Sequence, residues 1–103
     1  MPTPDDAYLK VVRMRLGEAR RARKMTQEDA ADAADLPLRT YQGLESVSSK
    51  RPFNPTLRTL RSVASAVGLS VSDLTQDPAP DELKALEHAL TSDLAAKVKR
   101  TSP

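Results

Sequence analysis

Apolar residues recur at helical spacing along most of the chain, and this periodicity is the strongest constraint on its fold. The clearest segment runs from a capping residue, Thr56, to a terminating glycine, Gly68. Its apolar residues repeat at intervals of three and four: Leu57, Leu60, Val63, Ala64 and Val67. Such a stripe is typical of a helix that buries one face against a core. The pattern predicts an all-α protein.

Capping residues and prolines divide the chain into further helices. Thr26 followed by Asp29 is an acidic relative of the capping box and marks a helix start. Pro37 disfavours helical geometry in the residue before it and suits the first turn of a new helix. The stretch from residue 47 to 55 contains two prolines and no helical period, so we expect a loop there. The helices are expected over residues 5–24, 27–34, 37–46, 57–67, 72–75 and 81–99.

A stiff connector, Asp77-Pro78-Ala79-Pro80, precedes the last of these helices. We therefore divide the chain into a part that holds the first five helices, residues 1–76, and a part made of the connector and the last helix, residues 77–103. The apolar stripe of the last helix consists of Leu83, Leu86, Leu90, Leu94 and Val98. An amphipathic helix needs a surface to cover. Three surfaces fit: its own domain, the same helix of a second protomer, or a different protein.

Many classes of functional site lack the residues they need. The chain has no cysteine and one histidine, His88, which excludes a disulfide framework, a zinc finger and a Ser-His-Asp triad. Its three glycines are isolated and form no phosphate-binding loop. We therefore expect no enzyme, cofactor or metal. No apolar run approaches the roughly 20 residues that span a bilayer, and no signal-peptide core is visible, so we expect a cytoplasmic protein.

Charge is segregated along the chain, although the formal net charge is only +2. Residues 10–24 hold seven basic residues and one acidic residue. Residues 28–35 hold four acidic residues, and residues 39–61 hold five basic residues and one acidic residue. Two basic regions that flank an acidic one can form a basic face for a polyanion. Solvated helix faces that alternate in sign are the alternative interpretation.

Two helices joined by a short turn, the second polar on its outer side, form a helix-turn-helix unit whose second helix fits the major groove. Here the sequence around them contains ARRARKMTQEDAA, RTYQGLE and NPTLRTLRSVASAVGLSVSDL. Over residues 16–74 the chain resembles the Cro/repressor-type helix-turn-helix family of bacterial and phage regulators, the xenobiotic-response-element class. The resemblance implies a five-helix lambda-repressor-like DNA-binding domain, here with an additional C-terminal amphipathic helix.

The resemblance also assigns residues to a DNA interface. Arg39 can bind guanine O6 and N7, Gln42 can bind adenine N6 and N7, and Leu38 can contact a thymine methyl group. The residues expected to approach the bases are Leu38, Arg39, Gln42 and Gly43. Those expected to contact phosphates are Gln27, Thr40, Ser46, Ser48, Ser49, Lys50, Arg51 and Asn54. The alternatives are a solubilising role for Arg39, packing at the edge of the core for Leu38, and a merely solvated loop around Lys50 and Arg51.

Other matched positions are structural. Arg20 and Glu45 fall on the family's ion pair between its first and third helices, which fixes the angle of the third helix. Tyr41 belongs to the core, with a hydroxyl that can reach the rim and a phosphate. Asp35 stands where the family has glycine, and aspartate tolerates the left-handed conformation that such a turn needs. Pro37 replaces the usual serine or threonine cap and removes one phosphate contact.

The basic first helix is longer than is usual in the family. Whether Lys10, Arg13 and Arg15 contact DNA or only solubilise that helix is left open. Together these features favour a sequence-specific transcriptional regulator that binds double-stranded DNA, a repressor, acting as a homodimer. The alternative is an antitoxin-type module that binds a toxin through its last helix and autoregulates its operon. The residues expected to meet a partner protein are Leu83, Leu86, Leu90 and Leu94.

Overall fold

The computed structural model of the chain describes the backbone of residues 4–101 and the side chains of residues 6–91. Every regular element in this part of the chain is a helix, which confirms the all-α prediction. The elements are α1 (Pro4–Ala22), α2 (Gln27–Ala33), α3 (Leu38–Glu45), α4 (Leu57–Ala66), α5 (Val71–Thr75) and α6 (Pro80–Thr101). None of the described helices is long and apolar enough to span a bilayer.

Short polar side chains start three of the helices. At α2 the backbone N–H of Asp29 donates to Thr26 Oγ1 and the Thr26 N–H donates to Asp29 Oδ2, both at 3.0 Å, so the predicted capping box is present. Thr56 accepts from the backbone N–H of Thr59 at α4, as expected. Ser70 caps α5 in a second capping box that the sequence analysis did not identify. These caps satisfy backbone donors that a helix start leaves unpaired.

Left-handed residues end three of the helices: Lys24 (φ 57°), Asp35 (φ 57°) and Gly68 (φ 81°). The N–H after each one bonds a carbonyl five residues back along the chain, as in the Schellman motif. Asp35 therefore keeps the turn between α2 and α3 in the conformation expected of it. Lys24 was not predicted there, because the sequence analysis placed it inside the first helix, which in fact ends at Ala22.

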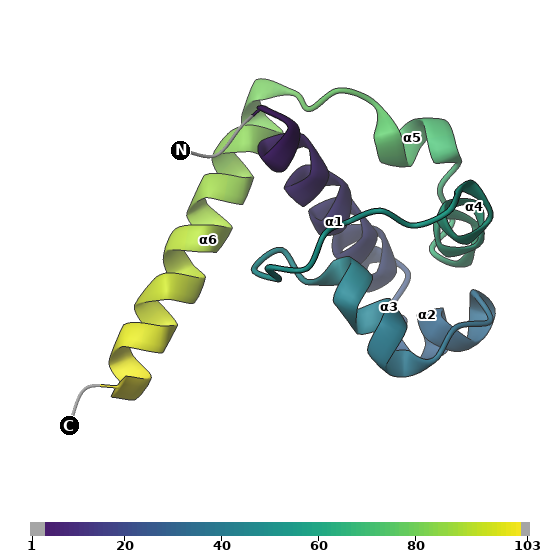
Figure 1. Cartoon of the computed structure of the whole chain (residues 1–103), viewed down its shortest axis with the longest axis horizontal. Coiled ribbons are helices and arrows are strands. Elements are labelled where there is room, and N and C mark those ends of the chain that lie inside the picture. The colour runs from purple at the N-terminus through teal and green to yellow at the C-terminus, as the bar shows by residue number, and fades with distance from the viewer. Residues whose placement is uncertain (1–3, 102–103) are drawn as a thin grey trace.

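The first helix lies at the centre of the fold and buries two faces (Figure 1). Val12 and Leu16 pack into the main core with residues of α2, α3, α4 and α5. Val11 and Met14 form a second cluster with Leu86 of α6. Helix α1 thus carries two apolar faces, one for the main core and one that α6 covers, whereas Ala22 at its end is exposed.

The beginning of α6 is fastened to α1 by a buried arginine. Arg15 is only 7% exposed and donates to both carboxylate oxygens of Glu82, at 2.8 and 2.7 Å. It also donates to the carbonyls of Leu74 and Gln76, in the segment that leads into α6. Leu86 is 5% exposed, so the first part of α6 covers its own domain. The rest of α6 extends away from the other helices (Figure 1).

Candidate nucleic-acid interface

Helix α3 presents a polar face that stays accessible among the described residues. Arg39 and Gln42 are exposed, Leu38 is 39% exposed, and Gly43 is half-buried. A Cβ atom built on Gly43 would meet no atom within 4 Å. The four residues expected to approach the bases therefore lie at accessible positions of one helix.

The opposite face of α3 is anchored in the core. Tyr41 is fully buried and belongs to the main hydrophobic cluster, together with Ala30, Ala31 and Ala34 of the α2 segment. Small alanine side chains let α2 and α3 pack closely. One expectation was wrong: the Tyr41 hydroxyl does not reach the rim, because it is itself buried, with no hydrogen-bond partner among the described residues. Burial raises its pKa, and the Glu45 carboxylate raises the pKa further.

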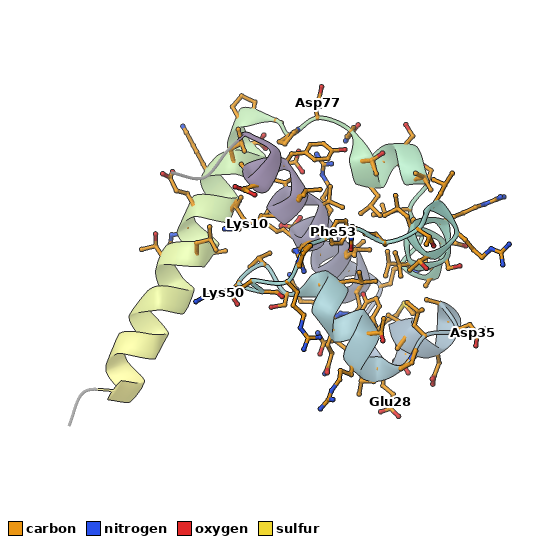
Figure 2. The ribbon with its side chains drawn as sticks, viewed as in Figure 1. Lys10, Glu28, Asp35, Lys50, Phe53 and Asp77 are labelled. Atoms are coloured by element: carbon orange, nitrogen blue, oxygen red, sulfur yellow. The ribbon has the colours of Figure 1, made fainter. Side chains whose placement is uncertain are left out.

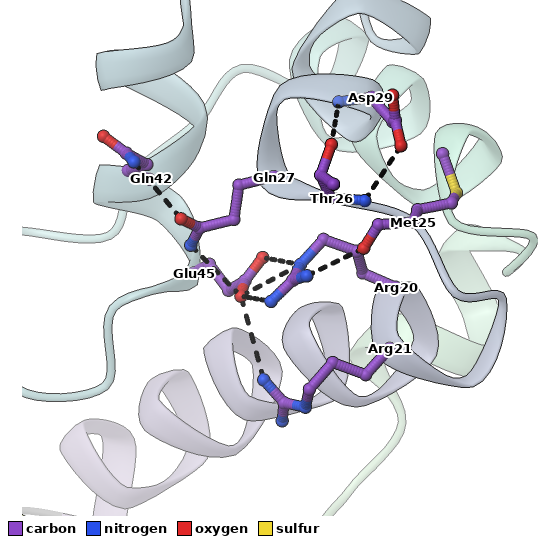
Figure 3. Close-up of polar contacts among 8 residues, drawn as sticks. All are labelled: Arg20, Arg21, Met25, Thr26, Gln27, Asp29, Gln42 and Glu45. Atoms are coloured by element: carbon purple, nitrogen blue, oxygen red, sulfur yellow. Dashed lines mark hydrogen bonds and ion pairs between the residues drawn. The ribbon is translucent and has the colours of Figure 1, made fainter.

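An ion pair between α1 and α3 fixes the end of the exposed helix (Figure 3). Arg20 donates to Glu45 through Nε, at 2.9 Å to Oε2, and through Nη2, at 2.7 Å to Oε1. Their side chains are only 13% and 8% exposed. Arg20 also donates to the Met25 carbonyl at 2.9 Å, which ties the pair to the segment before α2. The pair thus connects α1, α2 and α3 at one point.

The amides of Gln27 and Gln42 extend this network to the exposed face of α3. Gln27 Nε2 donates to Glu45 Oε1 at 3.3 Å, and Gln42 Nε2 donates to Gln27 Oε1 at 3.2 Å. Figure 3 shows the chain of contacts from Gln42 through Gln27 to Glu45. Burial alone would raise the pKa of Glu45, but hydrogen bonds from Arg20 and Gln27 and the positive charge of Arg20 outweigh it and hold the pKa below its ordinary value. The carboxylate is therefore charged at neutral pH.

A glycine on α1 makes room for this network. A Cβ atom on Gly17 would lie 3.0 Å from Glu45 Oε1 and 3.1 Å from Arg21 Nη1. Real Cβ atoms rarely approach other atoms so closely. In the sequence Gly17 is an isolated glycine with no motif around it. A glycine inside a helix costs conformational entropy. Its presence in the middle of α1 therefore indicates a position where another residue packs too closely for a side chain.

The loop between α3 and α4 carries most of the expected phosphate contacts. Ser48, Lys50, Arg51 and Asn54 are exposed. Of the other four expected phosphate ligands, Thr40 is exposed on α3, and Gln27, Ser46 and Ser49 are half-buried. All eight polar side chains thus retain some accessible surface.

Two of the arginines whose role was left open are structural. Arg13 is 4% exposed and Arg15 is 7% exposed, and both donate to backbone carbonyls inside the fold. Arg20 is also engaged internally, so three of the seven basic residues between 10 and 24 are not free to bind a polyanion. Lys10 is half-buried near α6 (Figure 2). The charge count overstated the basic face of α1, because internal carbonyls and carboxylates occupy these guanidinium groups.

A family model described as helix-turn-helix (HTH_3) matches residues 16–74, more than half of the chain. These residues run from the centre of α1 to the end of α5 and include the α2–α3 unit, the ion pair and the loop. No curated protein and no solved structure matches the sequence. The chain therefore belongs to the Cro/C1-type helix-turn-helix family (HTH_3) and is a DNA-binding regulator.

Proposed function

We propose that this protein is a transcriptional repressor that recognises an operator by placing α3 in the major groove. The observation that supports it best is the contrast between the two faces of α3. One face holds accessible Leu38, Arg39 and Gln42, and the other is fixed by buried Tyr41 and Glu45. A short helix held rigidly from behind can present base-contacting side chains in one orientation. Occupation of a promoter by such a domain blocks transcription by steric exclusion.

Each exposed residue suits a particular base contact. Arg39 offers the planar fork that binds guanine O6 and N7, and Leu38 offers methyl groups for thymine. Gln42 donates one N–H to Gln27, which leaves its second N–H and its carbonyl oxygen for adenine N7 and N6. Gly43 leaves space in which the DNA can approach the helix backbone. Each good bidentate contact contributes about 1–3 kcal/mol of base discrimination.

The phosphate contacts are proposed for polar groups around this helix. They are Gln27, Thr40, Ser46, Ser48, Ser49, Lys50, Arg51 and Asn54. Phosphate contacts set orientation and affinity and carry no sequence information directly. Lys50 and Arg51 supply the charge, and the neutral side chains supply hydrogen bonds. We also propose a homodimer, because a two-fold protein binds half-sites about 34 Å apart, one helical turn of DNA.

The test is selection of bound duplexes from a random pool, followed by titration of the selected operator at several salt concentrations. We expect Arg39→Ala to relax the preference at one base pair. Lys50→Ala/Arg51→Ala should weaken binding to all sequences and lower the salt slope by up to about two units. If the wild-type protein binds no duplex in dilute buffer, or if selection yields no consensus, the proposed function is wrong.

The antitoxin-type module is retained as a second candidate because most of α6 extends beyond its own domain (Figure 1). Leu86 is not available to a partner, since it is buried against α1. Leu83 is 41% exposed and Leu90 is half-buried, while the side chain of Leu94 lies outside those that the structure describes. Sedimentation equilibrium of the purified chain separates the candidates. A concentration-independent dimer supports self-association, and a monomer that is stable only with a co-expressed partner supports the module.

A further inference from the structure

Arg13 lies between α1 and the loop that follows α3. Its side chain is 4% exposed, and its guanidinium donates to three backbone carbonyls. The acceptors are Gly43 in the last turn of α3, Ser46 at its C-cap (3.2 Å) and Arg51 in the loop (2.7 Å). The Phe53 ring lies below the guanidinium, with its centroid 5.0 Å away. Figure 2 labels Lys50 and Phe53 in this loop.

These contacts place the cation where a helix end needs one. The last carbonyls of a helix have no partner inside the helix and carry partial negative charge. The planar guanidinium has five donors, so it can bond several carbonyls at once, and it stacks well on an aromatic ring. One side chain of α1 therefore bonds carbonyls at the end of α3 and the carbonyl of Arg51 in the loop that follows.

Among the residues that the structure describes, the loop has few other hydrogen bonds that could fix its shape. Within it, Ser49 N–H donates to the Ser46 carbonyl and Arg51 N–H donates to Ser49 Oγ. Both bonds are local. Arg13 provides the long-range hydrogen bonds to the segment, and Val47 adds an apolar contact with the cluster of Val11, Met14 and Leu86.

We propose that Arg13 is a positioning residue for DNA binding, which holds the α3–α4 loop so that Lys50 and Arg51 can contact phosphates together. It does so without touching the DNA, because it is buried beneath the loop. The inference rests on the proposed function and adds a residue of α1 to the determinants of affinity. Without Arg13 the loop would sample many conformations, and ordering it on DNA would cost conformational entropy.

Arg15 provides a matched control. It lies on the same helix, is similarly buried and also donates to backbone carbonyls, those of Leu74 and Gln76. These carbonyls belong to the end of α5 and its C-cap rather than to the DNA-binding loop. Loss of either arginine should lower the melting temperature. Only loss of Arg13 should alter the DNA interface.

The experiment compares wild type, Arg13→Gln, Arg15→Gln and Lys50→Ala/Arg51→Ala. Melting temperatures are measured by circular dichroism, and binding to the selected operator is measured by fluorescence anisotropy from 50 to 200 mM salt, well below each melting temperature. We expect Arg13→Gln to lower the salt slope by up to about two units, so that affinity changes up to about sixteenfold less across this range than in wild type. Arg15→Gln should keep the wild-type slope. A wild-type slope in Arg13→Gln overturns the inference while leaving the proposed function intact; absence of wild-type binding overturns the proposed function itself.

Combining the substitutions tests whether Arg13 acts through the loop. If it does, adding Arg13→Gln to Lys50→Ala/Arg51→Ala should weaken binding by less than about twofold, whereas additive losses would overturn the inference. If Arg13→Gln does not fold, Arg13→Lys replaces it, because the lysine keeps the charge but loses the planar fork.

Trypsin cleavage measures the mobility of the loop without DNA. Cleavage after Lys50 should be faster in the Arg13 variant than in wild type and unchanged in Arg15→Gln, and equal rates in all three would contradict a positioned loop.

Discussion

Replacement of Glu45 by alanine should destabilise the fold more than any other single change of an acidic residue in the described part of the chain. The carboxylate accepts hydrogen bonds from Arg20 and Gln27, and its side chain is only 8% exposed. Removal leaves the Arg20 guanidinium, 13% exposed, without its counter-ion. Removing one member of a buried pair costs about 3–5 kcal/mol. This is a large fraction of the roughly 5–15 kcal/mol that stabilises a domain of this size.

Urea unfolding at neutral pH, followed by circular dichroism, measures this loss. Glu45→Gln should cost less, about 1.5–3 kcal/mol, because the amide keeps one acceptor but loses the charge. Glu18→Gln is the control, since Glu18 is exposed on α1 and should change the free energy of unfolding by no more than about 0.5 kcal/mol. The protein concentration is held constant so that self-association does not alter the comparison. If Glu45→Ala costs less than about 1 kcal/mol, the pair behaves like an exposed ion pair and does not fix α3.

Three further predictions concern single positions. Gly17→Ala and Gly43→Ala should shift the urea midpoint in opposite directions. Gly17→Ala should destabilise the fold, because its Cβ would lie 3.0 Å from the Glu45 carboxylate. Gly43→Ala meets no atom within 4 Å, so it should stabilise α3 by up to about 1 kcal/mol while weakening operator binding. Equal midpoints in the two variants would contradict the close approach. Asp35→Gly should be neutral or stabilising by up to about 1 kcal/mol, and Asp35→Val destabilising, because φ is 57° at that position; thermal melting of both variants checks this. Hydrogen bonds from the buried Arg15 guanidinium lower the pKa of Glu82 from 4.5 to about 2. The stability that ionised Glu82 contributes is therefore present above about pH 4.5 and is lost as the pH falls toward 2. Glu82→Gln should therefore flatten the acid side of the stability profile, and an unchanged profile would show that this contact does not contribute.

The sequence predicts the helices well because their ends carry local signals. Thr26, Thr56 and Gly68 act within a few residues of their own positions, so no tertiary information is needed to interpret them. The same applies to Asp35, whose side chain tolerates the left-handed turn. Lys24 occupies an equivalent position without a comparable signal, since lysine shows no preference for positive φ. The end of α1 was therefore placed two residues too late.

The sequence predicts the candidate site only in part. Arg20 and Glu45 were paired through the family resemblance, whereas the role of Gln27 as a bridge between Glu45 and Gln42 depends on three helices meeting at one point. Nothing local in the sequence distinguishes Arg13 from an exposed arginine of the same helix such as Arg21. Its partners are carbonyls, and every residue has one, so residue identity gives no indication of the contact. Long-range contacts of this kind require coordinates.

The arginines of α1 also change how the charge of this protein is understood. Arg13, Arg15 and Arg20 are spaced along one helix, and each connects α1 to a different segment: the α3–α4 loop, the start of α6, and the end of α3. Glu82 and Glu45 offset the charges of Arg15 and Arg20, and the Arg13 guanidinium is bonded to internal carbonyls, so none of the three is free to contact a phosphate. The acidic side chains of α2, among them Glu28 and Asp32, are exposed and oppose the attraction of DNA. Direct contacts with phosphates must therefore come from exposed cations such as Lys50 and Arg51, and the salt slope of operator binding should reflect those residues rather than the total number of arginines and lysines in the chain.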